Sequence, residues 1–128
     1  MWLSFVAIGV GAAIGAWLRY GLSGWLNPLH STVPLGTLAA NLLGGYAIGL
    51  ALAWFAVRPD IAPQWRLFVV TGLLGGLTTF STFSAEVVQL FLRQQLGWAL
   101  ATMGLHLAGS LSMTALGWTT WRLLRPLA

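Results

Sequence analysis

The stretch Leu35-Gly-Thr-Leu-Ala-Ala-Asn-Leu-Leu-Gly-Gly-Tyr-Ala-Ile-Gly-Leu-Ala-Leu-Ala-Trp-Phe-Ala-Val57 carries no charged side chain. A helix needs about 20 consecutive, mostly apolar residues to cross the hydrocarbon core of a bilayer. This stretch is long enough, and turn-forming residues bound it on both sides, Pro34 before it and Arg58-Pro59-Asp60 after it. We therefore predict a membrane-spanning helix over Leu35–Val57.

Three further apolar runs flank this span, each with at most one charged residue: Trp2–Leu22, Leu67–Leu92 and Leu96–Trp121. The sequence thus predicts an all-α integral membrane protein in which residues 1–128 form a single four-helix transmembrane domain. The first arginine, Arg19, lies near the far end of the first apolar run and not before it, so the basic segment of a signal peptide is missing. We expect the first span to be retained.

The composition argues against a soluble domain and against catalysis. Of the 128 residues, 58% are hydrophobic and only 6% are charged, whereas soluble domains carry about a quarter charged residues. The absence of cysteine excludes disulfides and thiolate metal sites. The two acids, Asp60 and Glu86, lie on different segments, so no carboxylate pair is available for acid–base chemistry. We expect no enzymatic activity.

The six arginines give a net charge of +4, and they lie near the ends of the apolar runs, where such side chains anchor to lipid headgroups. Since no basic cluster interleaves with an aromatic face, we expect membrane lipid and no nucleic acid as a partner. Four spans place both termini on one side, which holds four arginines against two on the other. This bias weakly favours cytoplasmic termini and is small enough to permit both orientations.

Glycine predicts how the helices meet. Helices associate in lipid through close packing of small residues, because lipid tails are as apolar as leucine. The chain has sixteen glycines, and several pairs are four residues apart: Gly11 and Gly15, Gly45 and Gly49, Gly72 and Gly76. Four short helices enclose little volume for a site, so we expect a homo-oligomer.

Polar side chains form stripes within the spans, where they are costly and usually face a cavity or another helix. In the fourth span the residues at four-residue intervals are Thr102, His106, Ser110 and Thr114, and in the second they are Thr37 and Asn41. Each has a structural interpretation: hydroxyls often bond to their own helix, and Asn41 or His106 can simply join two helices. The alternative is a polar pathway.

The third span contains the run Gly75-Gly-Leu-Thr-Thr-Phe-Ser-Thr-Phe-Ser84, followed by Glu86. Adjacent glycines and β-branched threonines make this a poor stretch of helix. A break in a membrane helix frees main-chain groups, which transporters use to bind substrates and cations. We expect a functional break here. The pathway would be lined mainly by neutral hydrogen-bond donors, which suit a small anion.

The third-span segment Gly75-Gly-Leu-Thr-Thr-Phe-Ser-Thr-Phe83 resembles the signature of the small bacterial fluoride channels, the Fluc or CrcB family. The segments Gly15-Ala-Trp-Leu-Arg-Tyr20 and Gly36-Thr-Leu-Ala-Ala-Asn41-Leu-Leu-Gly44 agree with it, as do the length and the four spans. The resemblance covers essentially the whole chain. It implies a dual-topology, antiparallel homodimer in the bacterial inner membrane, with two pores that export fluoride passively.

The resemblance also implies roles for individual residues. Asn41, Phe80 and Phe83 match pore-lining positions. Main-chain carbonyls of Gly75 and Thr78 match positions that hold a structural sodium ion at the dimer axis. The remaining expected pathway residues are Arg19, Thr37, Ser81, Thr82, Glu86, Ser110 and Thr114. No family role is assigned to His106.

Two other functions remain open at this point. A proton-coupled exporter of the small multidrug type would use Glu86 or His106 as its proton carrier, although the first span offers no acid. A subunit that only helps other proteins assemble would explain the glycines, but it leaves the hydroxyl-rich third span without a purpose.

Overall fold

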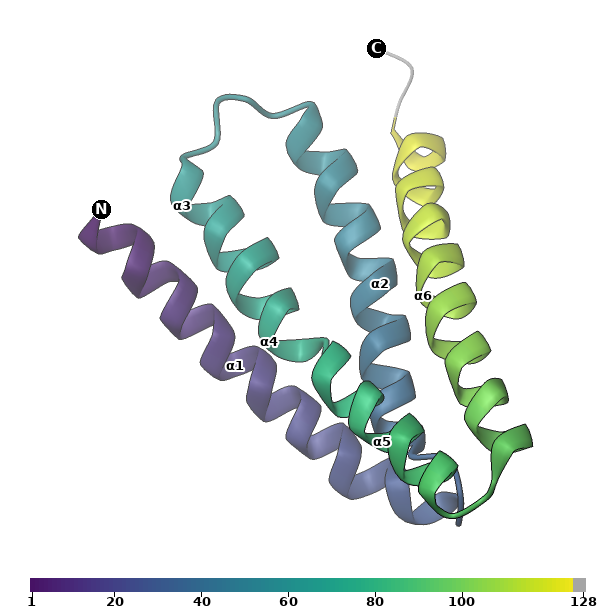
Figure 1. The fold of residues 1–128 in the computed structure, drawn as a ribbon. Helices are drawn as coiled ribbons and strands as arrows, with labels where there is room; N and C mark the ends of the chain where they lie inside the picture. The colour runs from purple at the N-terminus through teal and green to yellow at the C-terminus, as the bar shows by residue number, and fades with distance from the viewer. Residues whose placement is uncertain (126–128) are drawn as a thin grey trace.

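The computed structural model describes residues 1–125, and every regular element in that range is helical (Figure 1). Four helical segments are long and apolar enough to cross a membrane: Trp2–Leu29, Leu35–Ala56, Pro63–Leu92 and Leu96–Leu124. The predicted all-α membrane fold with four spans is therefore confirmed. The start of α1, the last turn of α6 and the connection between α2 and α3 all lie at the same end of the bundle (Figure 1).

The first two spans are nearly continuous helices, whereas the third consists of consecutive pieces. Helix α1 covers Trp2–Leu26, and the short 3-10 turn η1 covers Asn27–Leu29; α2 covers Leu35–Ala56. The third span comprises α3 (Pro63–Arg66), the π-helical segment η2 (Leu67–Leu74), α4 (Gly75–Leu77) and α5 (Phe80–Leu92). Helix α6 covers Leu96–Leu124.

Three of the predicted spans are longer in the structure than their hydrophobic runs, and the second ends one residue earlier, at Ala56. The first continues past Leu22 to Leu26, because helix formation ends only where Pro28 follows. The third begins at Pro63, whose fixed φ suits the first turn of a helix. The fourth reaches Leu124, and Arg125, the residue before Pro126, is extended.

Glycine lets the main chains of α1 and the third span approach each other closely. A Cβ atom on Gly72 would lie 2.8 Å from the carbonyl oxygen of Ile8, and one on Gly15 would lie 2.6 Å from the amide nitrogen of Leu77. Helices α2 and α6 also pack main chain to main chain: a Cβ on Gly49 would lie 2.8 Å from the Trp118 nitrogen. Side chains larger than hydrogen would push these helices apart.

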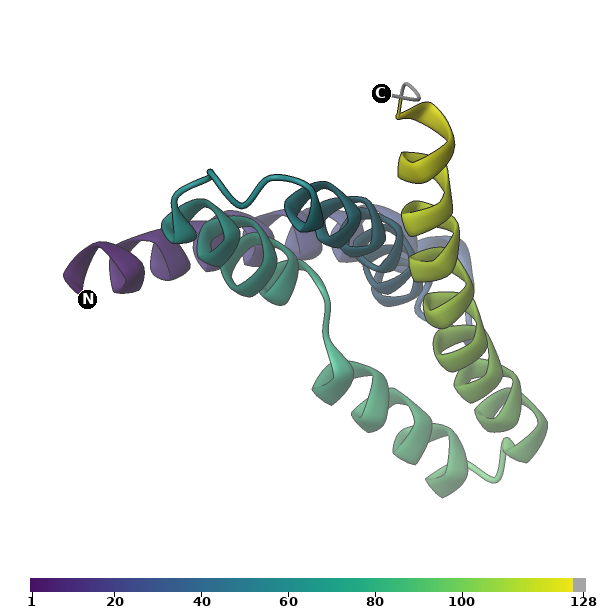
Figure 2. The ribbon, with the colours of Figure 1, turned by 90° about the horizontal axis from the view of Figure 1, so that it is seen from above.

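The third span changes direction at Thr78 and Thr79, which are extended rather than helical (φ −84°, ψ 154° and φ −151°, ψ 117°). This extended pair lies within the Gly75–Ser84 run. Figure 2 shows that α5 leaves the line of η2 and α4 after the extended pair and lies on the side of α6, away from α1. The third span therefore contacts α1 with its first half and α6 with its second half.

Candidate functional site

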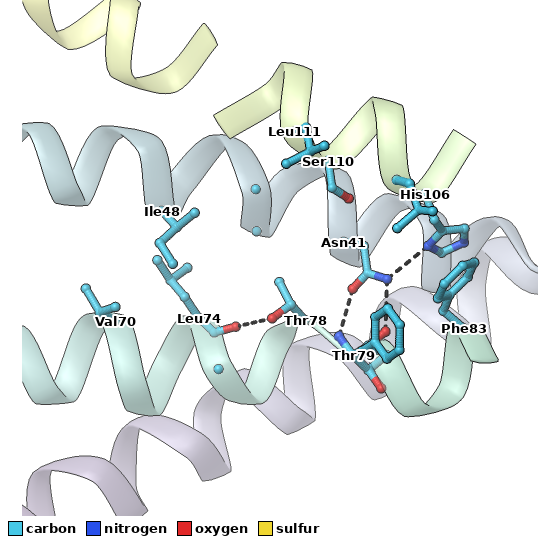
Figure 3. A pocket seen from close by; sticks show the side chains of 15 residues that line it. Asn41, Ile48, Val70, Leu74, Thr78, Thr79, Phe83, His106, Ser110 and Leu111 are labelled. Atoms are coloured by element: carbon cyan, nitrogen blue, oxygen red, sulfur yellow. Dashed lines mark hydrogen bonds between the residues drawn. The ribbon is translucent and has the colours of Figure 1, made fainter. Parts of the chain in front are cut away.

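The side chain of Asn41, in the second turn of α2, binds the extended pair of the third span (Figure 3). Its Oδ1 accepts a hydrogen bond from the Thr79 amide at 2.7 Å, and its Nδ2 donates to the Thr79 carbonyl at 3.0 Å. One side-chain amide thus pairs with both main-chain groups of Thr79. Such pairing satisfies polar groups that a helix break leaves exposed to an apolar interior.

The break releases the main-chain carbonyls of residues 75–78 from their usual helical partners, and two of them bear on the predicted cation site. In a continuous helix the Thr79 amide would bond the Gly75 carbonyl, but it donates to Asn41 instead. The Thr82 amide would likewise bond the Thr78 carbonyl, but it donates to Thr79 Oγ1 at 3.1 Å and so caps α5. The carbonyls of Gly75 and Thr78 therefore lose the donors that helix continuation would supply.

A third bond from Asn41 reaches His106 on α6, with 3.0 Å between Asn41 Nδ2 and His106 Nδ1. Because Nδ2 carries only donor hydrogens in this arrangement, Nδ1 is the acceptor and the neutral imidazole carries its hydrogen on Nε2. His106 is only 3% exposed, and Nε2 has no hydrogen-bond partner within the described residues. The ring instead stacks on Phe83, with centroids 4.5 Å apart.

The two phenylalanines of the third-span motif lie in different surroundings. Phe83 is buried between Phe80 and His106, whereas 71% of Phe80 is exposed on the single chain. Their rings meet edge to face at a centroid distance of 5.5 Å. An aromatic edge carries partial positive charge, and both rings line a cavity that Asn41 also lines.

These groups surround a cavity of about 380 Å³, which we call the central cavity (Figure 3). Its walls are mostly aliphatic, and its polar groups come from three spans: Asn41, Thr78, Thr79, His106 and Ser110. None of these lining side chains is charged, apart from any charge that His106 takes up. Asn41 Nδ2 and the Thr78 and Thr79 hydroxyls already donate within the protein. The remaining donors are therefore the Ser110 hydroxyl and His106 Nε2–H. Neutral donors on apolar walls suit a small anion, which fixed carboxylates would repel.

A second, smaller cavity of about 220 Å³ lies toward the end of the bundle where α1 joins α2, and we call it the loop cavity. Its lining includes Glu86 and Arg93 together with the connection that follows α1. Thr37 Oγ1 donates to Glu86 Oε1 at 2.6 Å, which joins α2 to α5 beside this cavity. The other carboxylate oxygen, Oε2, is buried without a hydrogen-bond partner in the described part of the chain.

The other sequence-predicted residues lie in several places. Ser110 lines the central cavity, whereas the Thr114 hydroxyl bonds back to the Ser110 carbonyl at 3.0 Å. The Thr82 hydroxyl accepts a hydrogen bond from Thr79 Oγ1, and Ser81 is an exposed residue next to it. Arg19 lines neither cavity; its Nε donates to the Gly76 carbonyl at 3.1 Å and so fastens α1 to α4.

Two residues of this site were not among the pathway residues predicted from the sequence. Thr79 bonds Asn41 through its main chain and caps α5 through its side chain. His106 joins Asn41 to Phe83. The polar stripe of the fourth span indicated that His106 faces a cavity or another helix, but the stripe alone does not identify its partners.

Four apolar spans and a cavity beside an interrupted helix define a small multi-pass membrane protein. The chain belongs to the CrcB family: the family model described as "CrcB-like protein, Camphor Resistance (CrcB)" matches residues 6–118. Similar curated proteins are named "Fluoride-specific ion channel FluC".

The similarity to these relatives extends over nearly the full length of both chains. The protein from Cupriavidus pinatubonensis is 57% identical over 122 residues, 95% of this chain and 97% of its own. The relative from Burkholderia cenocepacia is 61% identical over 120 residues, covering 93% and 94%. That from Pseudomonas putida is 58% identical over 118 residues, covering 92% and 93%. Their names describe channels, in agreement with the expected lack of enzymatic activity.

Proposed function

We propose that the protein is a fluoride-selective channel that lets fluoride leave the bacterial cytoplasm down its gradient across the inner membrane. The observation that carries the proposal is the central cavity, where Asn41 holds an interrupted helix beside Phe80 and Phe83. Relatives with 57% and 61% identity over nearly the whole chain are named fluoride-specific channels, which supports fluoride as the permeating ion.

The chemistry of fluoride matches this lining. Fluoride is small and strongly hydrated, so its passage requires donors that replace water. The hydroxyl of Ser110 and the Nε2–H of His106 are such donors, and the Phe80 and Phe83 edges add weak positive character. Weak, repeated binding allows rapid release, whereas a full positive charge in the cavity would hold the ion. The bond from Arg19 to the Gly76 carbonyl gives that arginine a structural task outside the cavity.

The functional unit in this proposal is an antiparallel homodimer of two oppositely inserted copies, with two pores. Phe80 lines the central cavity yet is 71% exposed on one chain, and Gly75 beside it is also exposed. A second copy over this side would complete the cavity wall. The near balance of arginines at the two ends is consistent with insertion in both orientations.

A structural sodium ion fits the groups at the helix break. The carbonyls of Gly75 and Thr78 have lost their helical donors, and oxygen ligands suit a hard cation. Gly75 is exposed on the single chain, so a second copy can pack against it. In a symmetric dimer the same carbonyls of the second copy would then share the ion. Bound there, sodium would neutralise freed carbonyl dipoles and hold the two breaks together.

One observation favours a second function, proton-coupled export. Glu86 is the only acid in any span, it lines the loop cavity, and its Oε2 lacks a partner among the described residues. Membrane carboxylates of this kind carry protons in pumps. Its bond to Thr37, however, gives it a structural role as well.

Flux measurements with Glu86→Gln distinguish the two functions. The glutamine keeps an oxygen that accepts the Thr37 hydrogen bond but cannot carry a proton. A channel should still release fluoride from liposomes without a pH gradient, and an imposed pH gradient should not drive uphill fluoride movement. If fluoride moves only with a proton gradient and Glu86→Gln abolishes the movement, the channel proposal is wrong.

A further inference from the structure

The connection between α1 and α2, residues 27–34, has few main-chain partners of its own and is held by two side chains. Asn27 Oδ1 accepts a hydrogen bond from the Gly36 amide at 2.7 Å, across the whole connection. His30 Nδ1 accepts from the amides of Val33, at 2.9 Å, and Thr32, at 3.2 Å. One nitrogen of an imidazole thus organises the tip of this connection.

The two hydrogen bonds to His30 Nδ1, which we call the His30 latch, require one protonation state of the ring. Main-chain amides only donate, so His30 Nδ1 must carry its lone pair, and the neutral ring has its hydrogen on Nε2. Protonation of Nδ1 would remove both bonds at once. Val33 is only 3% exposed, so its amide would be left in a largely dry environment without a partner. The closed connection is therefore incompatible with a doubly protonated His30.

The position of His30 ties the connection to the candidate pathway. Its ring meets Trp98 of α6 edge to face, with a centroid distance of 5.3 Å. It also lines the loop cavity, whose charged members are Glu86 and Arg93. Two residues after Leu35 begins α2, Thr37 donates to Glu86. Displacing the connection would therefore disturb both the cavity and the start of α2.

We propose that His30 is a positioning residue that latches residues 27–34 over the loop cavity while neutral and releases them when it is protonated. Imidazoles as a class change charge between about pH 5 and pH 8, so the latch is a device for acid sensing. Release disorders the cavity mouth and the Thr37–Glu86 contact, and conduction decreases. This last step rests on the proposed channel function, whereas the latch itself does not.

The latch is tested first without transport. The chain contains no cysteine, so Ser31→Cys, at an exposed position in the connection, accepts a single spin label in the full-length protein. The mobile fraction of the label should increase between about pH 7.5 and about pH 5.5. A label at Asp60→Cys, in the connection at the opposite end, should not respond.

His30→Asn provides the matched variant. An asparagine Oδ1 accepts amides two and three residues ahead much as Nδ1 does, but it does not titrate in this range. The label at position 31 should then give the same spectrum at both pH values. Asn27→Ala removes the other fastening, so the label should be more mobile at both pH values and retain the pH response.

The functional arm compares fluoride efflux from liposomes at the same two pH values, after subtracting leakage from protein-free liposomes. Efflux through the unaltered protein should fall at least about threefold at acidic pH, and efflux through His30→Asn should stay constant. An unchanged label spectrum, or a label response that survives in His30→Asn, would overturn the proposal. A label response together with constant efflux through the unaltered protein would overturn the step from the latch to conduction.

The two arms separate this proposal from the channel function. If no variant releases fluoride at any pH, the channel function fails, and the label spectra alone decide whether the latch exists.

Discussion

Substitution of Asn41 by aspartate changes one atom group at the centre of the site and tests its hydrogen-bond network. The aspartate keeps an oxygen for the Thr79 amide, which Asn41 Oδ1 binds at 2.7 Å. It loses the Nδ2 donor that serves the Thr79 carbonyl at 3.0 Å and His106 Nδ1 at 3.0 Å. The Thr79 carbonyl is then left facing a carboxylate oxygen, whereas His106 can move its hydrogen from Nε2 to Nδ1 and donate to the aspartate.

The expected cost follows from the donor that the Thr79 carbonyl loses. A buried acceptor without a partner costs about 1–3 kcal/mol, so an ionised aspartate should destabilise the fold by about that amount. Fluoride efflux should also fall at least about tenfold, since each additional ~1.4 kcal/mol on a barrier slows passage tenfold and a carboxylate repels the anion.

The assay combines thermal unfolding in detergent with fluoride efflux from liposomes. Gln95→Glu is the control, because it makes the same amide-to-carboxylate change at an exposed position. Asn41→Asp should unfold at a clearly lower temperature than this control and conduct far less. Equal unfolding temperatures and equal efflux for the two variants would refute the assignment of Asn41 as the residue that holds the helix break.

Three further predictions follow from the packing and the polar groups. Phe80→Ile or Phe83→Ile should sharply reduce efflux while leaving the dimer assembled, because each removes an aromatic ring from the wall of the central cavity. Unchanged efflux in both variants would remove the ring-edge role. Gly49→Ala should destabilise the protein because its Cβ would lie 2.8 Å from the Trp118 nitrogen. Gly104→Ala should be tolerated, since a Cβ there has no neighbour within 4 Å among residues 1–125, and equal thermal stability of the two variants would contradict the close α2–α6 packing. Efflux should be independent of a sodium gradient, with sodium acting only as a tightly held structural ion, and a flux that scales with that gradient would indicate coupled transport instead.

Hydrophobicity alone was sufficient to predict the four spans, because in a bilayer it decides which segments are buried. It placed the ends less accurately. Leu22 to Leu26 continues α1 because helix geometry persists until Pro28, and polar or aromatic residues at the membrane boundary do not interrupt it. The π-helical segment over Leu67–Leu74 has no sequence signal that distinguishes it from an ordinary apolar helix.

The site was predictable in its residue types but less so in its contacts. Asn41 was predicted as a site residue because an amide side chain within a membrane span requires hydrogen-bond partners. Its actual partners, Thr79 and His106, are 38 and 65 residues away along the chain, and only the tertiary fold brings them together. Thr114 shared the spacing of its stripe, yet its hydroxyl bonds to its own helix. Arg19 was predicted as a pathway residue, and nothing in the sequence indicated that it donates to the Gly76 carbonyl.

The most direct test of the central claim is the release of fluoride and chloride from liposomes that hold the purified protein, recorded with ion-selective electrodes at equal pH on both sides. Passive conduction through a lining of small, uncharged donors predicts rapid fluoride release with little chloride release. No fluoride release, or equal release of the two halides, would contradict the account.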